Sequence, residues 1–105
     1  MSAATKRLRR AVFARACNAC ENCGQWVTEE SGHLDHQFGR AKVPEAVSNC
    51  WALCVRCDLQ KTVNEPSASF WLARIERHAN RYGYTAEAEL AATKRNTLAV
   101  KGRAA

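Results

Sequence analysis

The sequence predicts a small α+β domain with one core, helices at both ends and a cysteine-rich centre. Three observations favour this fold class. The chain has 105 residues, which is enough for a single domain. All six cysteines lie between residues 17 and 57. Helix-forming segments precede and follow this region, whereas short strand-like segments lie within it.

The N-terminal half is expected to contain one helix, a tight turn and two short strands. Residues 5–16 have helix-forming composition and place Leu8, Val12 and Phe13 on one stripe. The other expected elements are a knuckle over 17–24, strands over 25–28 and 32–38, and a loop over 39–48 with a helical turn after Pro44.

The C-terminal half is expected to be mainly helical. A strand is predicted over 51–53, and a helix from 54 to about 64 ends before Pro66. Residues 67–82 give the clearest helix, with Trp71, Ile75, His78 and Tyr82 on one face and Gly83 as its stop. A last helix begins at Thr85 and ends near residue 95, before a loose tail.

Charge is distributed unevenly along the chain, whose net charge is +6. Residues 1–16 carry five bases and no acids, residues 17–65 carry four bases and seven acids, and residues 66–105 carry seven bases and three acids. We therefore divide the single domain into a basic N-terminal helix, a cysteine-rich core and basic C-terminal helices with a tail. Basic ends around an acidic centre indicate a polyanionic partner such as DNA, and solubilising charge is the alternative.

The composition argues against a disordered chain and against a membrane protein. The sequence is 47% hydrophobic and 25% charged, as in ordinary globular domains. No stretch approaches the roughly 20 apolar residues of a membrane span. Arg15 interrupts the only apolar run near the N-terminus, so a cytoplasmic protein without membrane contact is expected. An arginine-rich transit peptide is the alternative, because no acid precedes Glu21.

Two Cys-x2-Cys pairs give the strongest local signal. They are Cys20 with Cys23 and Cys54 with Cys57, separated by 30 residues. Two such knuckles supply the four thiolates of a tetrahedral structural zinc site. One Zn²⁺ ion would contribute on the order of 10 kcal/mol to the folding of a small core.

The cysteines could also form disulfides, a redox motif or a shifted set of zinc ligands. Disulfides are disfavoured without secretion, and no βαβ pattern supports a redox motif. Cys17 and Cys20 also have knuckle spacing, so the ligand set could shift by three residues. We prefer Cys20 and Cys23 because Gly24 follows and permits a tight turn toward sulfur. Cys50 is expected to be a small buried apolar residue.

Residues 20–62 contain a longer pattern around the two cysteine pairs: Cys20-x2-Cys23-Gly24, Asp35-His36, Asn49 and Leu53-Cys54-x2-Cys57-Asp58-x2-Lys61-Thr62. This pattern resembles the HNH endonucleases in their zinc-stapled form. The segment His36-x2-Gly39-Arg40 also looks like a variant found in some members. The resemblance implies a ββα-metal fold, a DNA endonuclease that leaves 5′ phosphate and 3′ hydroxyl ends, and a bacterial or phage-infected host cell. It also implies that the ββα unit approaches the minor groove.

The chemistry of phosphodiester hydrolysis can be assigned to individual residues of this segment. His36 is the candidate general base that activates water, since a histidine titrates near neutral pH. Asp35 and Asp58 are candidate ligands of a catalytic Mg²⁺ or Mn²⁺ ion. Asp58 departs from the usual His or Asn of the family, which favours harder ions over Ni²⁺ or Zn²⁺.

Three further positions are assigned supporting roles. The resemblance implies that Asn49 orients the region around His36, and Arg40 and Lys61 are expected to clamp the phosphate. His33 shares a strand face with Asp35 and is either an extra ligand, a phosphate contact or a surface histidine. Taken singly, Asp35 and Asp58 fit ion pairs with Arg40 and Lys61 equally well.

The predicted helix over 67–82 presents a basic stripe of Arg74, Arg77 and Arg81. The stripe suits DNA phosphates, and a solvated helix face is the alternative. The large aromatic residues are expected in the core rather than as stacking platforms; they are Trp26, Trp51, Phe70 and Trp71. A non-catalytic zinc module that binds nucleic acid or protein, and a redox-active dithiol protein, are the alternatives to a nuclease.

Overall fold

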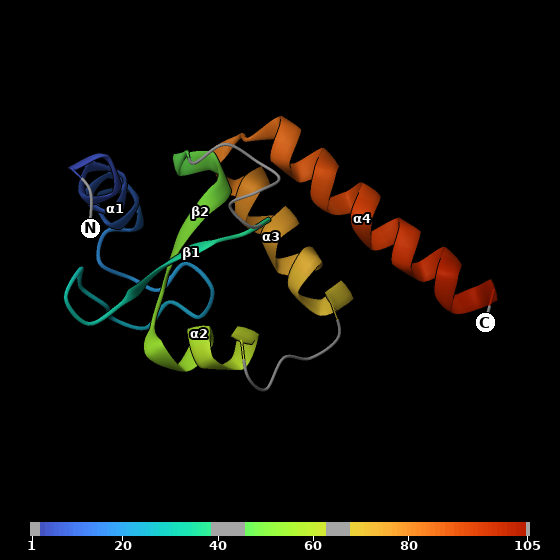
Figure 1. The fold of residues 1–105 in the computed structure, drawn as a ribbon, viewed down its shortest axis with the longest axis horizontal. Helices are drawn as coiled ribbons and strands as arrows, with labels where there is room; N and C mark the ends of the chain where they lie inside the picture. The colour runs from blue at the N-terminus through green and yellow to red at the C-terminus, as the bar shows by residue number, and fades with distance from the viewer. Residues whose placement is uncertain (1–2, 39–45, 63–67, 105) are drawn as a thin grey trace.

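A short β-hairpin followed directly by a helix forms the centre of the fold (Figure 1). The computed structural model describes residues 3–38, 46–62 and 68–104. Its elements are α1 (Ala3–Ala16), β1 (His33–His36), the 3-10 turn η1 (Val47–Asn49), β2 (Cys50–Leu53), α2 (Val55–Thr62), α3 (Ala68–Tyr82) and α4 (Thr85–Ala104). The predicted α+β class, with helices flanking a hairpin and helix, is confirmed.

The two strands pair antiparallel, from His33 opposite Leu53 to His36 opposite Cys50. All four residues of β2 are buried, which explains its apolar sequence Cys-Trp-Ala-Leu. β1 remains partly exposed, with His33 at its open end. Because α2 begins two residues after β2 ends, the helix packs beside both strands.

The core lies between α1, β2 and α3. Val12 and Phe13 of α1 are buried on the hairpin, as their predicted stripe requires. On the α3 side, the Trp51 ring meets Trp71 and His78 edge-on, with centroid distances of 6.2 and 5.4 Å. α4 packs beside α3 and extends away from the hairpin toward the C-terminus (Figure 1).

Gly32 allows α1 to approach the loop before β1. A methyl group at this position would lie 2.9 Å from Cε1 of Phe13 and would also collide with Val27. The Gly32 carbonyl accepts a hydrogen bond of 2.9 Å from Arg9 Nη2. The position therefore requires a residue without a side chain.

Several predicted boundaries were wrong. Residues 25–28 form no strand, and this segment contributes a single bridge between Ala19 and Trp26. The reason is the tight knuckle, closed by hydrogen bonds from Cys20 N to Gln25 O and from Gly24 N to Cys20 O. The last helix runs to Ala104 instead of ending near residue 95, as its alanine-rich sequence allows. Pro44 itself lies outside the described residues, and a helical turn is present after it as η1, Val47–Asn49.

The aromatic residues divide between core and surface. Trp51 and Trp71 are buried as predicted, whereas Trp26 is 71% exposed and Phe70 is 40% exposed. No helix in the described part of the chain combines the length and the apolar character needed to cross a membrane.

Candidate functional site

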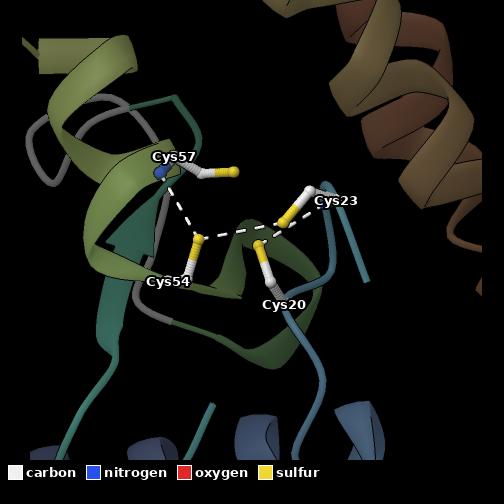
Figure 2. Close-up of side chains that lie close together, drawn as sticks. All are labelled: Cys20, Cys23, Cys54 and Cys57. Carbon is white, nitrogen blue, oxygen red and sulfur yellow. Dashed lines mark hydrogen bonds between the residues drawn. The ribbon is translucent and has the colours of Figure 1, made fainter. Parts of the chain in front are cut away.

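Four cysteine side chains from two distant segments converge on one point (Figure 2). Cys20 and Cys23 come from the knuckle after α1, and Cys54 and Cys57 come from the start of α2. Their sulfur atoms all lie within 4.8 Å of one another, with 3.8 Å between Cys23 Sγ and Cys54 Sγ. A tetrahedron with Zn–S bonds of about 2.3 Å has edges of about 3.8 Å, so the cluster has the dimensions of a zinc site.

Hydrogen bonds to sulfur hold the two knuckles in matching conformations. The amide of Cys23 donates to Cys20 Sγ and the amide of Cys57 donates to Cys54 Sγ, each at 3.5 Å (Figure 2). The side-chain amide of Asn22 donates to Cys57 Sγ at 3.3 Å. Such donors stabilise thiolates, which are the metal-binding form of cysteine.

The thiols of the cluster perturb one another in the way expected of a metal site. Burial raises the pKa of Cys57, and the neighbouring Cys20 sulfur raises it further. Burial also acts on Cys20, but amide donors from Cys23, Cys54 and Asn22 outweigh it and lower its pKa. Four adjacent thiolates are therefore stable together only when a cation compensates their charge.

The cluster is a candidate structural zinc site that joins the first knuckle to α2. Three of its four cysteines are buried and Cys23 is exposed. Cys17 is exposed and is not part of the cluster, and Cys50 is fully buried in the core. Within the described residues, no other group of three or more His, Cys, Asp or Glu side chains gathers closely enough to hold an ion.

Asp35 points from β1 toward α2. Its Oδ2 atom accepts a hydrogen bond of 2.8 Å from Trp51 Nε1 and lies 2.9 Å from Lys61 Nζ. One oxygen of this carboxylate is therefore held by both the hairpin and α2.

Asp58 lies across from β1, in the first turn of α2. Its Oδ2 atom is 3.7 Å from Nδ1 of His33. The Asp58 side chain is 24% exposed and that of His33 is 50% exposed. The face between β1 and α2 therefore carries two partly exposed carboxylates, one imidazole and one ammonium group. We call these residues, His33, Asp35, Asp58 and Lys61, the β1–α2 face.

His36 and Asn49 lie at the far end of the hairpin. His36 follows Asp35 as the last residue of β1 and pairs with Cys50. Asn49 is fully buried, and its Oδ1 atom accepts a hydrogen bond of 3.2 Å from the amide of Phe38. Its carbonyl also accepts a bond from the amide of Gln37, so Asn49 fixes the chain just after His36.

The predicted phosphate contacts have different environments. Lys61 pairs with Asp35, and Arg40 lies outside the described residues. Arg74 donates to Asn22 Oδ1 at 2.8 Å, whereas Arg77 and Arg81 are exposed on α3. The predicted stripe thus contains one arginine in the protein framework and two at the surface.

A buried ion cluster joins Arg15, Glu21 and His78, and no sequence motif indicated it. Arg15 forms two bonds to the Glu21 carboxylate, at 2.6 and 3.0 Å, and His78 Nε2 lies 3.1 Å from Glu21 Oε2. Burial alone would raise the pKa of Glu21, but bonds from His78, Arg15 and the Ala52 amide lower it to about 2. The available signal was His78 on an apolar helix face, since a buried histidine requires a polar partner.

Comparison with protein-family models, with curated proteins and with solved structures finds no significant match to this chain. The structure itself contains a four-cysteine cluster beside a two-stranded hairpin, and this arrangement is compatible with a zinc-binding ββα motif.

Proposed function

We propose that this protein is a metal-dependent endonuclease that hydrolyses phosphodiester bonds in DNA at the β1–α2 face. The observation that supports it is the pair of carboxylates, Asp35 and Asp58, carried by facing elements of one cysteine-stapled unit. Oxygen ligands of this kind suit Mg²⁺ or Mn²⁺, which bind through one or two carboxylates together with substrate phosphate and water.

Each side chain has a defined task in this proposal. A bound divalent ion supplies charge neutralisation at the phosphate and stabilises the leaving oxygen. Asp35 and Asp58 each offer a partly exposed carboxylate, one from β1 and one from α2. Lys61 exchanges its bond to Asp35 for a phosphate oxygen. His36 removes a proton from the attacking water, and Asn49 holds the backbone that follows it.

The test is relaxation of supercoiled plasmid by zinc-loaded protein, with added Mg²⁺ or Mn²⁺. We expect nicking that needs the added ion and falls by a factor of about 10²–10⁴ in His36→Ala. Asp35→Asn is expected to raise the ion concentration required. His33→Ala removes the other imidazole of the hairpin and is expected to reduce nicking much less than His36→Ala does. Wild-type activity in His36→Ala, or loss only in His33→Ala, would contradict the assignment of the base.

A non-catalytic zinc module that binds nucleic acid is the second candidate. The close Asp35–Lys61 pair favours it, because each carboxylate of the β1–α2 face already has a basic neighbour. This candidate predicts equal DNA binding by wild type and His36→Ala, with no nicking under any divalent ion. Tightly held zinc with unreactive cysteines would exclude the redox alternative.

A further inference from the structure

The basic residues of α3 face the first cysteine knuckle across a narrow gap. Arg74, Arg77 and Arg81 line this gap together with Asn22 and the edge of Glu21. Arg81 also borders an adjoining cavity of about 300 Å³ whose other wall is the knuckle itself, including Cys23 and Gly24. Since a water takes up about 30 Å³ in the liquid, this cavity has room for an anionic group and several waters.

Arg74 belongs to the protein framework. Its Nη1 atom donates to Asn22 Oδ1, and its guanidinium group lies 4.4 Å from the centre of the Phe70 ring. Through Asn22 it is linked to the sulfur of Cys57. Arg74 is therefore committed to the zinc knuckle and is not free to follow a ligand.

Arg77 and Arg81 differ from Arg74 in that both are exposed, one turn apart on α3. The acidic residues around them are already neutralised. Glu21 is 5% exposed and has Arg15 and His78 as partners, and Glu76 of α3 pairs with Arg95 at 2.5 Å. Two guanidinium groups thus face the gap without a carboxylate that remains available to them in the described structure.

The knuckle wall of the cavity includes Gly24, which has no side chain. Gly24 has a φ of +84°, and no atom lies within 4 Å of the position a Cβ would take. An approaching group therefore meets backbone instead of side chains here. An exposed peptide backbone beside two guanidinium groups suits a charged phosphate group better than an apolar ligand.

We infer that Arg77 and Arg81, with the knuckle over residues 20–24, form a binding site for DNA backbone phosphates that is separate from the β1–α2 face. This inference rests on the proposed function for the identity of the nucleic acid. Arginine binds phosphate through two parallel hydrogen bonds, and backbone contacts of this kind fix orientation without reading sequence. The site would anchor a flanking stretch of duplex while a different phosphate occupies the β1–α2 face.

The experiment measures the affinity of zinc-loaded protein for a 20-base-pair duplex between 50 and 300 mM salt, without added divalent ion. The test variant is Arg77→Gln/Arg81→Gln. Each lost phosphate contact is expected to reduce the slope of log K against log salt by about 0.9, so the pair should reduce it by about 1.8. The affinity at 100 mM salt should fall by roughly tenfold or more.

The matched control is Arg7→Gln/Arg10→Gln, which removes the same charge from two exposed positions on α1. It is expected to leave the slope within about 0.5 of wild type. Equal effects of the two double variants would overturn the inference and indicate a general electrostatic attraction. An unchanged slope in Arg77→Gln/Arg81→Gln would overturn it as well.

Zinc content and thermal unfolding of each variant complete the design. We expect one zinc per chain in both double variants. Loss of zinc in Arg77→Gln/Arg81→Gln would mean that these arginines compensate thiolate charge, which would also overturn the phosphate site. Arg77→Lys/Arg81→Lys should keep the salt slope, because it keeps both charges. Since binding is measured without catalytic ion, failure of nicking would leave this result unaffected.

Discussion

Glu21 is a residue on which several polar contacts of the core converge. Its carboxylate accepts bonds from Arg15, from the amide of Ala52 and from the ring of His78. Removing one member of a buried ion pair costs about 3–5 kcal/mol, because the partner is left buried and uncompensated. We expect Glu21→Gln to lower the free energy of unfolding by this amount in urea titrations, whereas Glu30→Gln at an exposed position should change it by less than about 0.5 kcal/mol.

The same residue predicts a pH dependence. The pKa of Glu21 is lowered from 4.5 to about 2, so the folded state holds its proton less tightly than the unfolded state. Its stabilisation is complete above pH 4.5 and is lost as pH falls toward 2. The shift corresponds to on the order of 3 kcal/mol.

Zinc release also contributes at low pH, so the useful quantity is a difference. The gap in unfolding free energy between wild type and Glu21→Gln should narrow as pH falls from 4.5 to 2. A gap that stays constant across this range would show that the carboxylate does not carry the effect.

At the scale of elements, the two knuckles join segments that lie about 30 residues apart in the chain. The first knuckle follows α1, and the second opens α2. A tetrahedral site requires all four thiolates, so Cys20→Ser should bind zinc far more weakly and lose its cooperative thermal transition. Cys17→Ser is the matched control, because Cys17 is exposed and outside the cluster. Zinc stoichiometry by native mass spectrometry, with thermal melts, separates the two outcomes; equal zinc binding would contradict the site.

The elements also differ in how well they could be predicted from the sequence. The apolar stripes of the sequence predicted the helices α1 and α3, and the spacing of the cysteines predicted that four of them would form a zinc site. The segment 25–28 was predicted as a strand because Trp26, Val27 and Thr28 are residue types that favour strands. In the structure the hydrogen bonds of the knuckle leave it a single bridge. The length of α4 depends on alanine-rich propensity without a stop signal, which fixes no end point.

The candidate site shows the same division between local and tertiary information. The order of motifs in the sequence indicated Asp35 and Asp58 as candidate metal ligands. The contact between His33 and Asp58 could not be predicted, because it depends on how α2 packs against β1. The Arg15–Glu21–His78 cluster depends on three segments meeting in the core and has no local signature. The roles of His36, Asn49, Arg40 and Lys61 in catalysis stay predictions that plasmid nicking can test.

The molecule as a whole is longer than its size requires. Its extents are 44 × 26 × 24 Å and its radius of gyration is 13.9 Å, against about 13 Å for a compact chain of this length. The excess arises because α4 continues beyond α3 (Figure 1). Residues 96–100 are all exposed, so this end of the helix adds little to the core.

Truncation separates the two parts of α4. Deleting residues 96–105 should change the free energy of unfolding by less than about 1 kcal/mol, because it removes no buried side chain of the described structure. Deleting residues 88–105 also removes the buried Ala88 and Ala91. This deletion should lower the free energy of unfolding several-fold more than the shorter one does. Urea midpoints of both truncations against the full chain give the comparison, and similar losses would place the stabilising contacts in the outer turns instead.

The contacts of Arg15 also bear on the order of events during synthesis. Its guanidinium group bonds to Glu21, six residues away, and to the hydroxyl of Tyr84, 69 residues away. During synthesis α1 is made well before Tyr84. Until Tyr84 is available, the guanidinium group of Arg15 must stay hydrated at a surface that is later buried. Because closing so long a loop carries an entropic cost, we expect the bond between Arg15 and Tyr84 to form late in folding.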